Sequence, residues 1–158
     1  MENIRIFDLF HDSISKETLV GINEIASQYL SPKDIELSLK NIVSAPKFDE
    51  IYSVIKQNER ILGYCGLRKA EPRLVKFTDA NAGELNALFI DLHSRNKGIG
   101  GILFSHVVEI AKERSYSYLV CKSSIIFKES GWGFYDKMKM QRIGMITDDM
   151  MAWKMSLK

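Results

Sequence analysis

LFIDLHSRNKGIGG, residues 88–101, is the segment from which the rest of this sequence is best interpreted. It opens with three apolar residues, Leu88, Phe89 and Ile90, which predict a buried strand. It closes with a glycine-rich run that leads into an amphipathic stretch with helical spacing. The backbone N–H groups of such a run and the positive end of the following helix can converge on one anion. The segment therefore predicts an anion-binding loop between a strand and a helix.

The residues expected to surround the anion form one continuous run. They are Arg95, Asn96, Lys97, Gly98, Ile99, Gly100 and Gly101. The glycines permit close approach of the backbone to a ligand, and Lys97 adds positive charge. The spacing is neither that of the P-loop nor that of the three-glycine dinucleotide fingerprint. An ordinary strand-to-helix turn stays open as the alternative for the loop taken alone.

The Arg-x-x-Gly-x-Gly spacing of this loop resembles the signature of the GNAT superfamily of N-acyltransferases. In that family the loop cradles the pyrophosphate of acetyl-coenzyme A. The resemblance implies that acetyl-coenzyme A is the co-substrate. It also implies that the N–H group of Leu88 contacts the thioester carbonyl, and that the backbone at Phe89 and Ile90 contacts the pantetheine arm.

Length and composition predict one globular domain over residues 1–158. The chain is 46% hydrophobic and 27% charged, and its formal net charge is only +2. Neither a nucleic-acid partner nor a membrane partner is expected from so small a charge and from runs shorter than the ~20 apolar residues of a membrane span. Cys65 and Cys121 lie apart in apolar runs, which predicts reduced core thiols and no metal site. A cytoplasmic location is the resulting expectation.

Hydrophobic spacing predicts an alternating series of strands and helices. Strands are expected at 4–10, 51–55, 61–67, 84–90, 116–121, 142–146 and 151–157. Residues 74–77 are expected to extend the strand at 61–67. Helices are expected to begin at Ser15 and at Ser31 and to cover 99–114 and 131–138. The helix from Ser31 should bury a stripe made of Ile35, Leu39, Ile42 and Val43. The strands at 84–90 and 116–121 should be parallel because a helix connects them, and such a pair can splay at its ends.

This order resembles the GNAT fold over nearly the whole chain. The expected class is α/β (α+β), with a mixed, mostly antiparallel central sheet that contains a splayed parallel pair and is flanked by helices. The first two helices could form a lid that shapes an acceptor pocket or could simply cover the sheet, and the sequence leaves both open.

Two side chains are candidates for the chemistry of acyl transfer. Glu84 shares a strand face with Leu88 and resembles the strand glutamate that some family members use as a general base; a solvated charge at a strand end is its alternative. Tyr135 lies in Phe-Tyr-Asp-Lys, residues 134–137, which resembles the family motif whose tyrosine hydroxyl lies near the coenzyme A sulfur. A phenol with a pKa of about 10 can protonate a leaving thiolate. Packing in the core is the alternative for Tyr135.

The sequence also departs from the family pattern. Leu92 stands where the family usually has proline, Lys139 and Met140 stand where Gly-Phe is usual, and Ser123 and Ser124 replace an asparagine often found there. The first two departures remove no chemical group. Because of the third, the resemblance does not extend to the cofactor contacts between Cys121 and Tyr135.

The resulting prediction is an N-acetyltransferase that moves an acetyl group from acetyl-coenzyme A to a primary amine of a small molecule or peptide, by direct attack in a ternary complex. The acceptor's identity stays open, and a homodimer is compatible with the sequence. A non-catalytic module that binds or senses coenzyme A is the alternative, and a nucleotide-phosphate binder is a second one.

Overall fold

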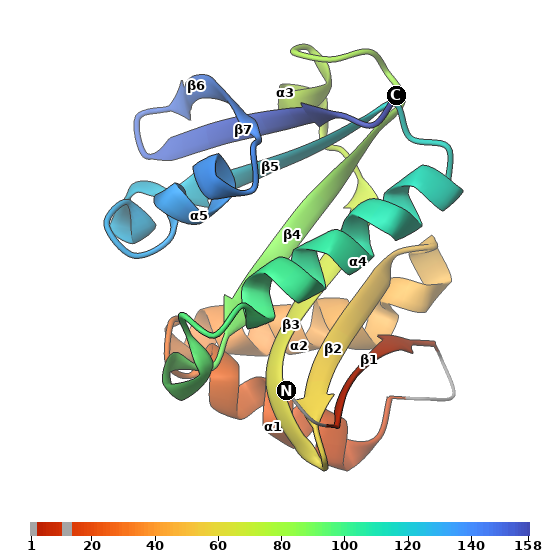
Figure 1. Cartoon of the computed structure of the whole chain (residues 1–158), viewed down its shortest axis with the longest axis vertical. Coiled ribbons are helices and arrows are strands. Elements are labelled where there is room, and N and C mark those ends of the chain that lie inside the picture. Colours follow the sequence, from red (N-terminus) through yellow and green to blue (C-terminus); the bar gives the residue numbers. More distant parts are fainter. Residues whose placement is uncertain (1–2, 11–13) are drawn as a thin grey trace. The chain divides into compact units, whose positions relative to one another are not determined.

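A computed structural model describes residues 3–10 and 14–158 of the chain. Within these residues, seven strands form one sheet in the order β1-β2-β3-β4-β5-β7-β6 (Figure 1). β4 (Ala82–Ile90) pairs with β5 (Tyr118–Ser124) in parallel, whereas the pairs β1–β2, β2–β3, β5–β7 and β6–β7 are antiparallel. This mixed sheet with flanking helices confirms the fold class predicted from the sequence.

The chain divides into two compact units. One comprises Met1–Leu67 with Ala87–Val107, and the other comprises Arg68–Asn86 with Val108–Lys158. The single-domain organisation expected from the sequence stays a prediction.

The first unit begins with three antiparallel strands. They are β1 (Ile4–Leu9), β2 (Ile51–Gln57) and β3 (Arg60–Lys69). The tight turn between β2 and β3 places Asn58 at a φ of 54°, a left-handed conformation that asparagine tolerates better than most residues. The predicted hairpin is therefore confirmed, although both of its strands are longer than expected.

Two helices follow β1, and serine caps both of them. Ser15 accepts a hydrogen bond from the N–H group of Thr18 at the start of α1 (Lys16–Ala26), and Ser31 accepts one from Asp34 at the start of α2 (Pro32–Ser44). A proline in the first turn suits α2 because the N–H group it lacks would have no partner there. In Figure 1, α2 lies behind β2 and β3.

The apolar stripe predicted for α2 is only partly correct. Ile42 is buried, and Ile35 and Leu39 pack against the same core cluster as α1. Val43 is 47% exposed, so its inclusion in the buried stripe was wrong. A step of one residue turns a helix by about 100°, which carries Val43 beyond the face that Ile42 buries.

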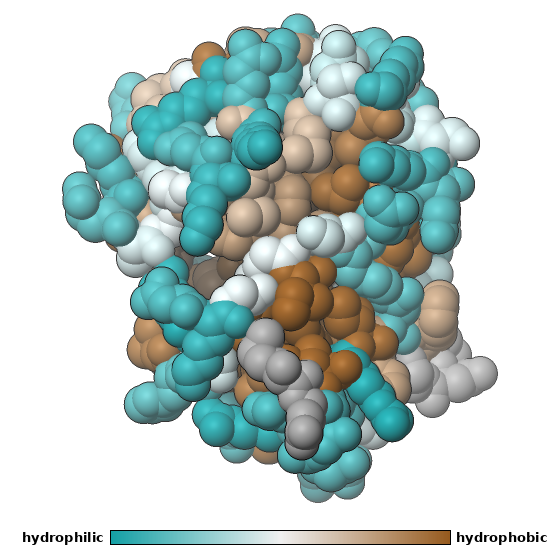
Figure 2. All heavy atoms as spheres, viewed as in Figure 1, coloured by the Kyte–Doolittle hydropathy of each residue, from teal (hydrophilic) through white to brown (hydrophobic). Residues whose placement is uncertain are grey.

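The helix α4 (Ile99–Glu113) follows β4 and passes in front of β3 in Figure 1. Its part in the first unit buries Ile99, Leu103, Phe104 and Val107. Other apolar side chains of this unit remain partly exposed, among them Phe7 at 44% and Ile102 at 38%. On the face seen in Figure 2, residues coloured as hydrophobic lie at the surface among hydrophilic ones.

The second unit contains β5 and the hairpin of β6 (Gln141–Thr147) with β7 (Met150–Ser156). β7 pairs with β5 along the length of both strands. The helix α5 (Trp132–Lys137) precedes the hairpin, as predicted. Cys121 of β5 is a buried free thiol, as is Cys65 of the first unit, which confirms the expectation of core thiols.

The expected extension of the third strand at residues 74–77 was wrong. The chain forms the short helix α3 (Pro72–Val75) there, and the N–H groups of Leu74 and Val75 both donate to the carbonyl of Glu71. Pro72 occupies the first turn, where its fixed φ favours a helix and its missing N–H group costs nothing.

The parallel pairing of β4 with β5 is short. It covers Ala82–Glu84 against Tyr118–Val120, although β4 continues to Ile90 and β5 to Ser124. This limited pairing agrees with the splaying predicted for the pair.

Candidate functional site

The loop between β4 and α4 lies entirely within the first unit. A 3₁₀ turn at Leu92–Ser94 follows β4, and residues 95–98 then lead into Ile99 at the start of the helix. Asn96 and Gly98 have φ values of 61° and 80°. A β-branched residue in place of Gly98 would be strained by this left-handed backbone. The predicted break between strand and helix is thus built on two left-handed residues.

The space beside Gly98 is open. A Cβ atom added to Gly98 would have no atom within 4 Å, apart from its chain neighbours. The first hydrogen bond of α4 joins the N–H group of Ile102 to the carbonyl of Gly98. The N–H groups of Ile99, Gly100 and Gly101 therefore precede the hydrogen-bonded part of the helix, where an anion finds both donors and the positive end of the dipole.

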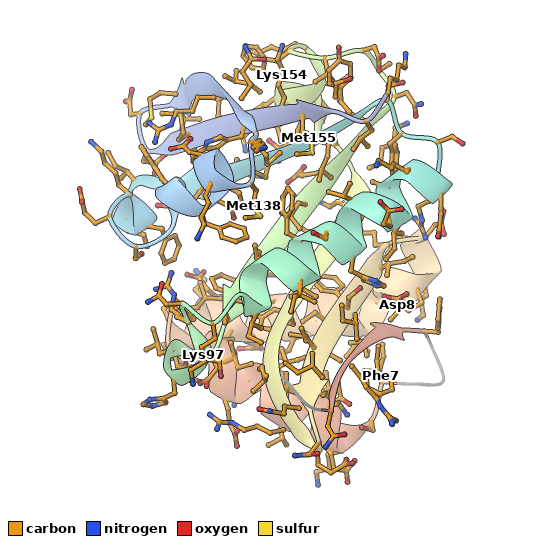
Figure 3. All side chains as sticks on the ribbon, in the orientation of Figure 1. Phe7, Asp8, Lys97, Met138, Lys154 and Met155 are labelled. Carbon is orange, nitrogen blue, oxygen red and sulfur yellow. The ribbon has the colours of Figure 1, made fainter. Side chains whose placement is uncertain are left out.

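Two cationic side chains accompany the loop. Lys97 is exposed and lies at the surface beside the start of α4 (Figure 3). The guanidinium carbon of Arg95 lies 6.0 Å from the centre of the Tyr29 ring, at the outer limit of a cation–π contact. Both charges favour an anionic ligand such as a pyrophosphate, so the residues present fit the phosphate-bearing end of coenzyme A.

The strand segment before the loop is less buried than the sequence suggested. Leu88, Phe89 and Ile90 do form a strand, but all three are only half-buried, so the prediction of a buried strand was wrong in that respect. Ala87 has a φ of 54°, a left-handed conformation that locally re-aims the backbone at Leu88.

In the second unit, Glu84 is the centre of a buried ionic cluster. It is 1% exposed, and its Oε2 atom accepts hydrogen bonds from Arg68 Nη2 and Lys122 Nζ, both at 2.9 Å. Its Oε1 atom accepts one from the backbone N–H group of Glu71 at 3.2 Å. The alternative of a solvated charge is therefore wrong.

Glu71 extends this cluster toward solvent. Its carboxylate accepts from Lys122 Nζ at 2.8 Å and from Arg73 Nε at 2.6 Å. Partial burial tends to raise the pKa of Glu71, but hydrogen bonds and charge from Lys122 and Arg73 outweigh it and lower the pKa. The ammonium group of Lys122 thus lies between two carboxylates.

Tyr135 lies on α5 and is half-buried. Its ring centre lies 4.8 Å from that of Trp153 and 5.5 Å from that of Phe134. Asp136 accepts hydrogen bonds from Trp153 Nε1 at 3.1 Å and, in a bidentate pair, from Arg142 at 3.0 and 2.7 Å. These hydrogen bonds from Arg142 and Trp153 lower the pKa of Asp136. The packing holds the ring of Tyr135 without burying it completely.

The structure thus groups the predicted residues by unit. Leu88, Phe89, Ile90 and residues 95–101 lie in the first unit, and Glu84 and Tyr135 lie in the second. Sequence reasoning missed the partners of Glu84, namely Arg68 and Lys122. A signal for Lys122 existed, because a lysine in an otherwise apolar strand usually requires a partner charge on a neighbouring strand.

No helix in residues 3–10 and 14–158 is both long and apolar enough to cross a membrane. In the same residues, no group of three or more His, Cys, Asp or Glu side chains is arranged to hold a metal ion.

Comparison with known families and structures gives a consistent result. The family described as Acetyltransferase (GNAT) family matches residues 18–138. No curated protein matches the sequence significantly.

Among solved structures, an acetyltransferase of the GNAT family from Staphylococcus aureus Mu50 has a TM-score of 0.75 at 20% identity, covering 98% of this chain and 99% of that one. The PaiA N-acetyltransferase from Thermoplasma acidophilum, in complex with coenzyme A, has a TM-score of 0.72 at 15% identity, with 97% and 98% covered. An aminoglycoside 6'-N-acetyltransferase complexed with coenzyme A has a TM-score of 0.76 at 10% identity, with 98% and 97% covered. At these identities the likeness is one of fold.

Proposed function

Because this chain belongs to the GNAT family of acetyltransferases, we propose that it transfers an acetyl group from acetyl-coenzyme A to a primary amine of a small molecule or peptide. The observation that carries the proposal is the loop at Asn96–Gly101, where the open space beside Gly98 lies at the start of α4. Two of the solved structures with this fold contain coenzyme A, which supports the same ligand here.

In the proposed complex, the first unit binds the co-substrate. The N–H groups of residues 96–101 contact the pyrophosphate, with Arg95 and Lys97 supplying positive charge. The N–H group of Leu88 donates to the thioester carbonyl and stabilises the oxyanion of the tetrahedral intermediate, and the left-handed Ala87 aims that group. The backbone of Phe89 and Ile90 pairs with the pantetheine amides.

The reaction is a direct attack in a ternary complex. The neutral amine nitrogen forms a bond to the acetyl carbon, the carbon–sulfur bond breaks, and the amine loses one proton. Tyr135 donates its hydroxyl proton to the departing thiolate, and the amine proton passes to a base or to water. A proton from water then restores the Tyr135 hydroxyl group for the next turnover. No group other than the amine becomes acetylated in this scheme.

Glu84 can serve in one of two alternative roles. As a general base it would accept the amine proton, either directly or through water. Its carboxylate is 1% exposed and already accepts three hydrogen bonds, which favours a role in fixing β4 to its neighbours. If the second role is the correct one, bulk water takes the amine proton.

The engagement of Glu84 also favours one alternative, a module that binds coenzyme A without catalysis. Such a module would keep the loop at residues 95–101 but would not depend on Glu84 or Tyr135. A panel of primary amines, assayed for thiol release from acetyl-coenzyme A, separates the two functions. Release that depends on one class of amine supports the transferase, whereas calorimetric binding of coenzyme A without thiol release for any amine supports the module.

A further inference from the structure

A buried carboxylate lies just before the proposed anion-binding loop in the chain. Asp91 directly follows β4 and is 4% exposed. A negative charge so close to a phosphate site weakens phosphate binding unless it is neutralised or serves another purpose. Its contacts indicate what that purpose is.

The Asp91 carboxylate accepts three side-chain hydrogen bonds from three segments of the first unit. Oδ1 accepts from Gln28 Nε2 at 2.8 Å, just beyond α1. Oδ2 accepts from Arg60 Nη2 at 2.8 Å, at the start of β3, and from Ser94 Oγ at 3.1 Å, within the loop itself. Arg60 neutralises the charge, and Gln28 and Ser94 fix the direction of the carboxylate.

Gln28 binds the loop twice. Its Oε1 atom accepts the backbone N–H group of Leu92 at 2.8 Å while its Nε2 atom donates to Asp91. This orientation of the amide is the one that chemistry requires, since a carboxylate only accepts and an N–H group only donates. The hydroxyl group of the neighbouring Tyr29 donates a hydrogen bond to the carbonyl oxygen of Ile90. Both side chains therefore hold the end of β4 and the first loop residues.

The backbone completes this arrangement. The N–H group of Asp91 donates to the carbonyl of Leu62 on β3, and the N–H group of Ser94 donates to the carbonyl of Asp91, both at 2.8 Å. Burial tends to raise the pKa of Asp91, but hydrogen bonds from Gln28 and Ser94 and the charge of Arg60 outweigh it, so the pKa lies below its ordinary value. The carboxylate is thus ionised at neutral pH and keeps its full capacity as an acceptor.

We propose that Asp91, held by Gln28 and Arg60, is a positioning residue that sets the loop in its phosphate-binding geometry before the ligand arrives. The inference rests on the proposed function, because it assumes that the loop binds the phosphates of acetyl-coenzyme A. A loop that is already ordered loses less conformational entropy on binding, so the ligand binds more tightly. The hydrogen bonds of Asp91 with Gln28 and Arg60 are called the clamp below. Removing the clamp should weaken phosphate binding without affecting the reacting atoms.

The test measures calorimetric affinity for coenzyme A, together with KM and kcat for acetyl-coenzyme A. The variants are Asp91→Ala, Asp91→Asn and Gln28→Met. Gln28 is exposed, so its substitution leaves the fold intact even if Asp91→Ala unfolds the chain. Lys112→Ala, which removes a half-exposed cation from α4, is the control.

The positioning role predicts that Asp91→Ala and Gln28→Met raise Kd and KM by about tenfold or more, the scale expected when a binding geometry is lost, while kcat at saturation is retained. The Kd and KM of Asp91→Asn should lie between those of these two variants and those of the unsubstituted chain, because the amide keeps one acceptor oxygen. Pantetheine, which lacks the phosphates, should lose less affinity than coenzyme A in the same variants.

Two results would overturn the inference, and they differ from each other. Normal coenzyme A affinity in both Gln28→Met and Asp91→Asn, with only a lower melting temperature, would make the clamp purely structural. Failure of the unsubstituted chain to bind coenzyme A would refute the proposed function itself, and the inference with it.

Discussion

Replacement of Glu84 by alanine is expected to destabilise the second unit strongly. The change leaves the cations of Arg68 and Lys122 without the carboxylate that both now contact at 2.9 Å. Breaking a buried ion pair by removing one partner costs about 3–5 kcal/mol. The low end applies here, because Lys122 is 16% and Arg68 31% exposed and Lys122 keeps Glu71 at 2.8 Å. A loss of about 3 kcal/mol lowers the melting temperature of a chain of this size by about 6–12 °C.

The assay is thermal unfolding followed by circular dichroism, supported by urea titration of the same proteins. The matched control is Glu36→Ala, which removes a 71% exposed glutamate from an ion pair with Lys40 and should change the free energy of unfolding little. Lys122→Met combined with Glu84→Gln should recover part of the loss, since it removes both charges together. A melting temperature for Glu84→Ala that matches that of Glu36→Ala would refute the reasoning. A fall in the turnover of Glu84→Ala without loss of stability would instead favour Glu84 as a general base.

Three further substitutions test the site. Tyr135→Phe should lower turnover by roughly 10²-fold or more, the scale of a general acid, with little change in the Kd for acetyl-coenzyme A; an unchanged rate, measured by thiol release, would make the residue structural. Gly98→Val should weaken coenzyme A binding in calorimetry, because a β-branched residue at φ 80° strains the loop and its side chain enters the open space, and unaltered affinity would favour an ordinary turn. Asp136→Asn should lower the free energy of unfolding above about pH 4, the ordinary pKa region of aspartate. The difference in stability between the two proteins should vanish as the pH falls through the lowered pKa of Asp136, because only the ionised carboxylate gains from Arg142. A stability difference that stays constant with pH would contradict this.

Local features of the sequence were sufficient to predict most elements. The cap at Ser31, the glycines after Lys97 and the helical spacing that follows them act within a few residues, so their effects can be inferred from the chain alone. The region around Pro72 shows the limit of such reasoning. The apolar residues Leu74, Val75 and Phe77 suited a strand, but Pro72 initiated one turn of helix instead.

The surroundings of the site residues depended on contacts distant in sequence. Glu84 was identified as a candidate, but its partner Lys122 lies on the adjacent parallel strand, and no local pattern specifies that register. Asp91 was not identified, because its contacts with Gln28 and Arg60 form only when α1 and β3 pack near the end of β4. The assignments of Glu84, Tyr135 and the loop residues to catalysis and binding stay predictions.

The most direct test of the proposed acetyl transfer is mass spectrometry after a single turnover with isotopically labelled acetyl-coenzyme A and an amine that supports thiol release. Direct attack in a ternary complex predicts that the label appears on the amine in proportion to the thiol released, and that the protein carries no labelled acetyl group when the amine is omitted. Label on the protein that then passes to the amine would contradict direct attack, and thiol release without any labelled amine would contradict acetyl transfer itself.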